Sequence, residues 1–277
     1  MNADYHIHTS FSFDSFYDME EVVKDAIELG LDEICFTDHV DYGIKKDRTG
    51  RESEKELIEH KRDYNVDYPA YFAKIEELQK KYEGQIVIRK GLEFGMQVPE
   101  IPKFQKLAET YPMDFILLSI HSFNNHQIYK KDAYLLMDHI PYHRRYYEEM
   151  LGCVKNFKDY TVLAHIDNIN RYDPRRAVPL DSVRDLLEEI LKTVIQDGKG
   201  LEVNTATARY GVTDMTPSRE ILRLYKELGG EILSIGSDVH RKGSLGLELG
   251  YNREELRKLG FRTFCTFEKQ KPVFHEL

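Results

Sequence analysis

The stretch Ala3-Asp4-Tyr5-His6-Ile7-His8 alternates in polarity and predicts a strand that begins within a few residues of the N-terminus. Successive side chains of a strand point to opposite faces, so His6 and His8 point to the same side. A second stretch, Gly236-Ser237-Asp238-Val239-His240, repeats this spacing with Asp238 and His240. Two runs far apart in the chain therefore each offer a pair of donor side chains to one pocket.

Between these two stretches, short apolar runs alternate with longer helical patterns, a rhythm typical of βα units around a parallel sheet. About seven such units are predicted. We expect strands at residues 5–8, 33–37, 86–92, 115–120, 161–164, 201–204 and 232–235, with 263–267 as a possible closing strand. We expect helices at 19–29, 68–82, 181–195 and 218–228. A length of 277 residues suits one α/β barrel, so a single domain over 1–277 is predicted.

Composition narrows the class of protein. The 39 lysines and arginines against 48 acidic residues give a net charge of -9, which disfavours a nucleic-acid-binding surface. Cys35, Cys153 and Cys265 lack the spacing of a disulfide framework or a thiolate zinc site. No apolar run is long enough to span a bilayer, and the N-terminus lacks the pattern of an export signal. We therefore expect a cytoplasmic protein that acts on a small molecule, with neither nucleic acid nor membrane as a partner.

Two segments depart from the βα rhythm. Residues 45–67 are densely charged and poor in apolar side chains, which indicates either a solvated loop or a lid over a site. Residues 138–147 mix aromatic and basic side chains. On an acidic protein this mixture indicates the polar face of a long helix rather than a nucleic-acid patch.

Histidines and carboxylates gather where the predicted strands end. In a parallel barrel these ends converge on one face, which carries the active site. Six of the eleven histidines lie at such ends, although a single one would more often serve structure than bind metal. Imidazole and carboxylate without thiolate suit zinc, manganese or iron in an open catalytic site. The candidate metal ligands are His6, His8, Asp14, His39, Glu93, His121, His165, Asp238 and His240.

These candidates exceed what one ion uses, so two or three ions that share a carboxylate are predicted, with Glu93 as the bridge. Asp14 has a structural alternative, because Ser12-Phe13-Asp14-Ser15 precedes the helix at 19–29 and Asp14 is a candidate N-cap. Ser15 and Asp18 are other candidate caps for that helix.

Six motifs, in their order along the chain, resemble the PHP (polymerase and histidinol phosphatase) superfamily. They are Asp4-Tyr5-His6-Ile7-His8, Thr37-Asp38-His39, Gly91-Leu92-Glu93, Ser119-Ile120-His121, Ala164-His165 and Gly236-Ser237-Asp238-Val239-His240. The resemblance implies a distorted TIM-like (β/α)7 barrel with three divalent ions. It implies one ion held by His6, His8, Glu93 and Asp238, a second by Glu93, His121 and His165, and a third by Asp14, His39 and His240.

The C-terminal half is most similar to the monofunctional histidinol-phosphate phosphatases of histidine biosynthesis. Residues 165–172, 202–209 and 217–230 carry this similarity. It implies hydrolysis of L-histidinol phosphate to L-histidinol and phosphate. The expected nucleophile is a hydroxide that bridges the ions. A cysteine nucleophile is disfavoured, because only Cys35 lies near the cluster and it is expected to be buried in the core.

Several further side chains are candidates for supporting roles. Arg171 and Arg209 follow strand ends and are expected to bind the substrate phosphate, with a surface salt bridge as the alternative. Asp4 and Asp38 are expected either to orient ligand imidazoles or to serve local structure only. Acidic or aromatic side chains of residues 11–17 or 41–45 are expected to recognise the imidazole and the amine of the substrate.

Three other functions remain open at this point. The same metal centre could act on a nucleotide, a DNA end or phosphotyrosine. A catalytically inactive binding module is disfavoured, because every candidate ligand position carries a competent donor. A metal-dependent amidohydrolase is disfavoured because Lys90, the nearest lysine, is expected on the opposite face of its strand from Glu93.

Overall fold

The computed structural model describes residues 1–130 and 132–277, in which a parallel sheet curls into a nearly closed barrel. β3 (His39–Val40) lies off the main path and pairs with β4. The predicted barrel is confirmed, with a strand at each of the seven expected places. In spatial order these are β1 (Ala3–Ile7), β2 (Glu33–Phe36), β4 (Val87–Gly95), β5 (Phe115–Ser119), β8 (Val162–Leu163), β9 (Gly200–Asn204) and β10 (Leu233–Gly236).

The barrel closes through a backbone bridge just past the ends of β1 and β10. Ile7 and Val239 form a parallel bridge, and His8 N donates to Val239 O at 2.9 Å. The prediction that residues 263–267 form a closing strand is wrong. β11 (Thr263–Glu268) instead pairs antiparallel with β12 (Lys271–Glu276). The physical reason is the turn between them, where Lys269 and Gln270 both have positive φ (50° and 63°), the geometry of a tight hairpin.

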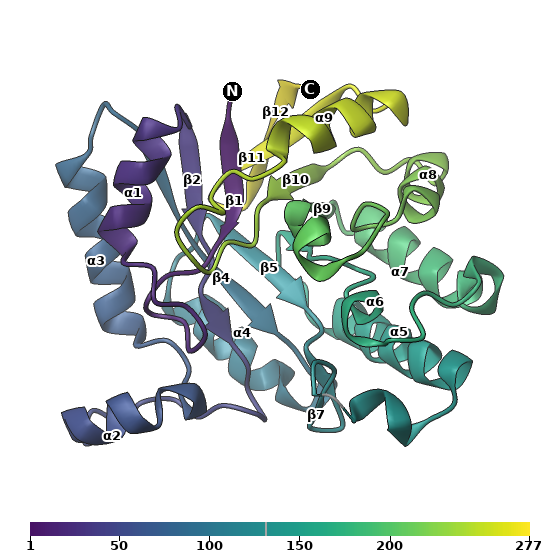
Figure 1. Cartoon of the computed structure of the whole chain (residues 1–277), viewed down its shortest axis with the longest axis horizontal. Coiled ribbons are helices and arrows are strands. Elements are labelled where there is room, and N and C mark those ends of the chain that lie inside the picture. Colours follow the sequence, from purple (N-terminus) through teal and green to yellow (C-terminus); the bar gives the residue numbers. More distant parts are fainter. Residues whose placement is uncertain (131) are drawn as a thin grey trace.

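Helices cover the outside of the sheet, with α1 and α3 at one side of Figure 1 and α5, α7 and α8 at the other. The helices predicted at 19–29, 68–82, 181–195 and 218–228 are confirmed, although residues 180–182 form a separate 3-10 turn before α7. The main helices are α1 (Met19–Glu28), α3 (Tyr68–Lys81), α4 (Ile101–Thr110), α5 (His139–Asn156), α7 (Arg184–Gln196), α8 (Arg219–Glu227) and α9 (Leu249–Lys258).

The charged segment 45–67 folds back on the barrel. It contains α2 (Glu54–Glu59) and a 3-10 turn (Lys61–Asp63). Lys46 N donates to Asp63 O at 3.0 Å, and Lys61 Nζ donates to Ser15 O at 2.7 Å. The described side chains from Lys45 to Asp63 are exposed or half-buried, so the segment is a solvated surface excursion, and Lys61 fastens it to the loop after β1.

Residues 138–147 form the start of α5, as predicted, but they are only partly a polar face. Tyr142 and Tyr146 are buried, since their spacing of four places both on the side of the helix that faces the core. Arg145 is half-buried and pairs with the buried Glu149 at 2.7 Å. The aromatic side chains of this segment therefore belong to the core.

The cysteines and the apolar character of the helices were the two features that composition addressed. Cys35, Cys153 and Cys265 are buried free thiols in the described part of the chain, and burial raises the pKa of the Cys35 thiol well above its ordinary value. Across residues 1–130 and 132–277, none of the helices combines the length and the apolar character that crossing a bilayer requires.

Asp18 caps helix α1. Its Oδ1 accepts from Glu20 N at 2.9 Å and from Glu21 N at 3.1 Å, which satisfies two backbone donors of the first turn. The alternative that Asp14 caps this helix is therefore wrong, and the Asp14 carboxylate is free to face the barrel mouth.

Replacing Asp18 by alanine removes this cap, so we expect the free energy of unfolding to fall by about 1 kcal/mol. Asp18→Asn keeps an oxygen acceptor and should retain most of the stability. Urea denaturation followed by circular dichroism measures both variants. Equal losses in the two variants would show that the side-chain hydrogen bonds are not the cause.

Candidate metal centre

The nine predicted donors meet at one mouth of the barrel, where the C-terminal ends of the strands converge. Each comes from a strand end or from the residues just after one, apart from Asp14, which lies in the loop between β1 and α1. Asp238 and His165 have positive φ (54° and 22°), a conformation that costs energy for residues other than glycine. The backbone is thus strained at two of the donors, as is common at functional sites.

The carboxylate of Glu93 lies at the centre of this cluster. It is fully buried, and each of its two oxygens faces a different group of imidazoles. Oε2 lies 2.9 Å from His39 Nδ1, 3.2 Å from His6 Nε2 and 3.4 Å from His8 Nε2. Oε1 lies 2.9 Å from His165 Nε2 and 3.2 Å from His121 Nε2. Glu93 therefore occupies the position that a bridging carboxylate requires.

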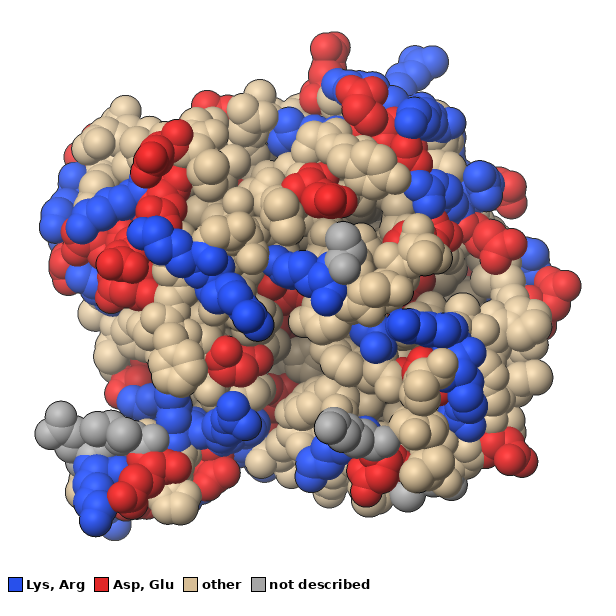
Figure 2. Space-filling model, in the orientation of Figure 1, with Lys and Arg blue, Asp and Glu red and all other residues tan. Residues whose placement is uncertain are grey.

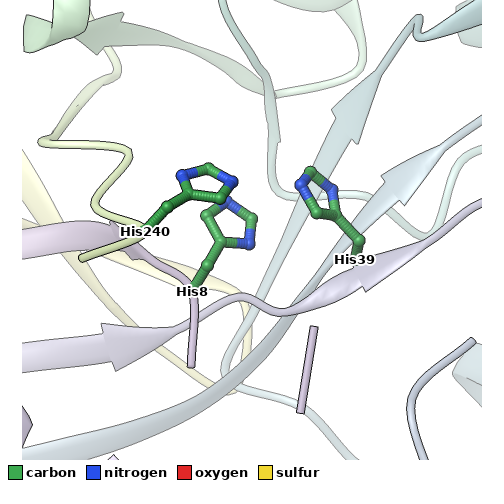
Figure 3. Close-up of side chains that lie close together, drawn as sticks. All are labelled: His8, His39 and His240. Atoms are coloured by element: carbon green, nitrogen blue, oxygen red, sulfur yellow. The ribbon is translucent and has the colours of Figure 1, made fainter. Parts of the chain in front are cut away.

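Two further carboxylates complete the three donor sets expected from the resemblance. Asp238 Oδ1 lies 3.4 Å from His8 Nε2 and 3.6 Å from His6 Nε2. Asp14 Oδ2 lies 3.4 Å from His39 Nε2 and 3.3 Å from His240 Nε2. The ring of His8 stacks on those of His39 and His240, with its centroid 4.1 Å from each, and these two rings lie 5.7 Å apart (Figure 3). The structure brings the members of each set together.

The donor atoms face one another in a way that fits bound cations. His8 Nε2 is buried without a hydrogen-bond partner among the described residues, although carboxylate oxygens of Glu93 and Asp238 lie 3.4 Å away. Burial, together with the neighbouring His240 and His39, holds the pKa of His8 well below its ordinary value, so its imidazole is neutral. A neutral imidazole nitrogen and a carboxylate oxygen both present lone pairs, which a divalent ion between them would satisfy.

The same cluster keeps its central carboxylate ionised. Burial alone would raise the pKa of Glu93, but the imidazoles of His6, His39 and His121 outweigh burial and hold this pKa well below its ordinary value. An ionised carboxylate is the form that binds metal.

Asp4 and Asp38 bind backbone rather than imidazoles. Asp4 Oδ1 accepts from Ser237 N at 2.8 Å, and Asp38 Oδ1 accepts from Thr9 N at 2.7 Å. The expectation that they orient ligand imidazoles is therefore not met, and the alternative of a local structural role describes both. Each carboxylate fixes a loop that carries donors.

Glu202 and Asp41 instead contact the imidazoles of two candidate ligands, His6 and His121, and the sequence reasoning missed both. His6 Nδ1 contacts Glu202 Oε1, and His121 Nδ1 lies 2.8 Å from Asp41 Oδ1. A signal was present in each case. Asp41 lies two residues after His39, and Glu202 lies in a predicted strand at a position of the inward face.

Gly95 at the end of β4 leaves room for the pair of Asp41 and His121. A Cβ atom at this position would lie 1.8 Å from Asp41 Oδ1 and 2.5 Å from His121 Nδ1. Any side chain there would displace the carboxylate, so glycine is required by close approach rather than by backbone angle.

Arg171 and Arg209 lie in different surroundings. Arg171 is buried and donates to Asp238 Oδ2 at 3.0 Å and to Asn204 Oδ1 at 2.6 Å, so a surface salt bridge is the wrong description of it. It lines a pocket of about 550 Å³ above the donor cluster. Arg209 donates to Asp238 O at 2.8 Å and lines a neighbouring hollow with Asp14 and His240.

A parallel barrel with a histidine and carboxylate cluster at its C-terminal mouth defines a class of metal-dependent hydrolases. Residues 4–206 match the PHP domain family, and the chain belongs to that family. A histidinol-phosphatase of Lactococcus lactis subsp. lactis is 30% identical over 271 residues, which cover 97% of this chain and 95% of that protein.

Solved structures have the same fold. The crystal structure of histidinol phosphate phosphatase from Lactococcus lactis, complexed with zinc, L-histidinol and phosphate, gives a TM-score of 0.84 at 28% identity and covers 98% of both chains. A structure from Listeria monocytogenes gives a TM-score of 0.74 at 22% identity, covering 91% of this chain and 99% of that one.

The pKa of His121 in metal-free protein gives a test of the Asp41 contact. Burial lowers this pKa, but the carboxylates of Glu93 and Asp41 outweigh burial and raise it to about 9. Asp41→Asn removes one carboxylate, so the pKa should move back toward the ordinary histidine value. Imidazole NMR titration of chelator-treated protein measures the change.

The same pair predicts a pH-dependent loss of stability. Because the folded pKa of His121 is raised, its contribution is complete below the unfolded value of about 6.5 and is lost as pH rises through about 9. Asp41→Asn should therefore cost more free energy of unfolding at about pH 6 than at about pH 10. The control is Asp63→Asn, at an exposed pair with His60. An identical His121 pKa in wild type and Asp41→Asn would contradict the assignment.

Proposed function

We propose that residues 1–277 form one PHP-type domain that hydrolyses L-histidinol phosphate to L-histidinol and phosphate with three divalent metal ions. The observation that carries the proposal is the buried Glu93 carboxylate shared by two groups of imidazoles. The relative from Lactococcus lactis, which binds zinc, L-histidinol and phosphate, supports the choice of substrate because it matches this chain over 98% of its length.

The donor sets assign residues to the ions. His6, His8, Glu93 and Asp238 would hold the first ion, with Glu93 shared by the second. Zinc, manganese and iron suit these imidazole and carboxylate ligands. When bound, such ions activate water near neutral pH and offset the negative charge of the phosphoryl oxygens. Glu202 and Asp41 would fix the imidazoles of His6 and His121 in the orientation that binding needs.

Arg171 is the first proposed phosphate ligand. Two of its nitrogens bind Asp238 and Asn204, while its Nε is buried without a partner among the described residues. A buried guanidinium that two side chains already fix in position can donate to a phosphate oxygen without reorganising. Arg209, beside Asp14 and His240 at the neighbouring hollow, is the second proposed phosphate ligand.

The residues that line the pocket carry a small net positive charge, although the protein as a whole is negatively charged. The chain carries -9, yet four basic residues line the pocket against three carboxylates: Lys45, Arg62, Lys130 and Arg171 against Asp14, Glu93 and Asp238. Figure 2 shows this face hollowed near its centre, with both basic (blue) and acidic (red) side chains around the hollow. A local excess of cations attracts an anionic substrate such as a phosphate monoester.

The alternative of an amidohydrolase finds no support at Lys90. Its Nζ donates to Glu76 Oε1 at 2.7 Å on the outside of the barrel. A lysine in that position cannot reach the donors.

Phosphate release from L-histidinol phosphate tests the proposal. Purified protein should hydrolyse it rapidly, lose activity on chelation, and regain activity with zinc, manganese or iron, because the ions supply the activated water. p-Nitrophenyl phosphate is the generic control substrate. Metal-dependent activity on that ester alone would contradict the assigned substrate, and inactivity with metals bound would contradict the enzymatic function.

A glycine substitution tests the metal assignment without removing a donor. Gly95→Ala should displace Asp41 and His121, and we expect metal content and activity to fall by about tenfold or more. Elemental analysis of the purified protein measures the loss. The matched control is Gly250→Ala in helix α9, where an added Cβ meets nothing within 4 Å. Full metal content in Gly95→Ala would contradict the assignment of His121.

A further inference from the structure

The pocket above the donors also contains side chains that neither bind metal nor carry charge. Phe13, Gln127, Tyr129, Asn168, Tyr172 and Tyr210 contribute to its lining. These residues come from four separate segments of the chain. The loops at 11–17 and 41–45, which were expected to recognise the alcohol part of the substrate, contribute only Phe13 among them.

Phe13 already has partners for its ring. Lys45 Nζ lies 4.0 Å from the ring centroid, and the imidazole of His39 lies 5.3 Å from it. A ring held between a lysine and a proposed metal ligand supports the site but offers little free face to a substrate.

Three tyrosines form a continuous wall elsewhere in the pocket. The ring of Tyr172 lies 6.1 Å from that of Tyr129 and 6.0 Å from that of Tyr210. The guanidinium of Arg171 covers Tyr210 at 4.7 Å. Tyr129 is 38% exposed, and its hydroxyl is held by the Gln127 side chain. Tyr129 is therefore a partly exposed aromatic ring in the pocket lining, a group suited to stacking on another planar ring.

Asn168 adds a hydrogen-bond acceptor to the same pocket. The residue is only 3% exposed, and its Oδ1 has no partner among the described residues. Its backbone N donates to His165 O at 2.8 Å, which keeps it within one turn of a proposed metal ligand. A buried acceptor that lines a pocket without a partner fits an N–H donor of a bound molecule.

We propose that Tyr129 and Asn168 determine specificity for the alcohol part of the substrate, with Tyr129 stacking on a planar ring and Asn168 accepting from an N–H group. This inference rests on the proposed function. In the reaction the ester P–O bond breaks, water supplies the hydroxyl that joins phosphorus, and its proton passes to the leaving alkoxide. Neither residue takes part in that transfer, so both act only through binding.

Three phosphate monoesters separate the two roles. L-Histidinol phosphate has a ring and N–H donors, phenyl phosphate has only a ring, and ethyl phosphate has neither. Tyr129→Leu should lower kcat/KM for both ring substrates about tenfold relative to ethyl phosphate. Asn168→Leu should lower kcat/KM for L-histidinol phosphate about tenfold relative to phenyl phosphate. We expect both effects to appear mainly in KM.

Conservative variants and distant controls complete the design. Tyr129→Phe keeps the ring and Asn168→Asp keeps an acceptor, so both should retain the wild-type ratios. Tyr251→Leu and Asn156→Leu, on exposed faces of α9 and α5, should leave every ratio unchanged. Unchanged ratios in Tyr129→Leu and Asn168→Leu, or an equal loss on all three esters, would overturn the inference. Wild-type inactivity on all three esters would instead overturn the proposed function.

Discussion

The buried charge of Glu93 is the constraint on which the rest of the site depends. An ionised carboxylate inside a barrel is costly unless positive or hydrogen-bonding partners surround it. Its strand, β4, lies between β2 and β5 in the sheet, and the short β3 places His39 directly opposite it in register. This central place lets imidazoles approach both carboxylate oxygens from separate strands. Moving Glu93 by one residue would turn the carboxylate out of the barrel.

A second layer of acidic groups extends this arrangement outward. Glu202 contacts His6 and Asp41 contacts His121, and both imidazoles also contact Glu93. Carboxylates and imidazoles therefore alternate outward from Glu93. Asp4 and Asp38 act one step further away, on the loops that carry the donors. Each contact limits the freedom of the next group, and the donor geometry is therefore built into the protein before any ion binds.

The sequence predicted the barrel and the convergence of the donors because both follow from local rules. The two-residue period of a strand puts His6 and His8 on the same side of the sheet. The C-terminal ends of the strands in a parallel barrel lie on one face. Roles that depend on contacts between distant segments were beyond such rules. Asp41 meets His121 only in the folded barrel, residues 45–67 dock through Lys61 to Ser15, and Tyr129 meets Tyr172 of the short helix α6 (Ile169–Tyr172). The tight turn at Lys269 and Gln270 similarly overrode the expected closing strand.

The bridge between Ile7 and Val239 joins the two ends of the barrel, and it has a consequence for how the protein matures. During synthesis His6 and His8 leave the ribosome long before Asp238 and His240, which follow the last strand of the barrel. The complete set of donors exists only once the chain has emerged beyond His240, and domains generally fold as units. Capture of the proposed ions would thus follow closure of the barrel, and the metals available at that stage would decide which ions bind.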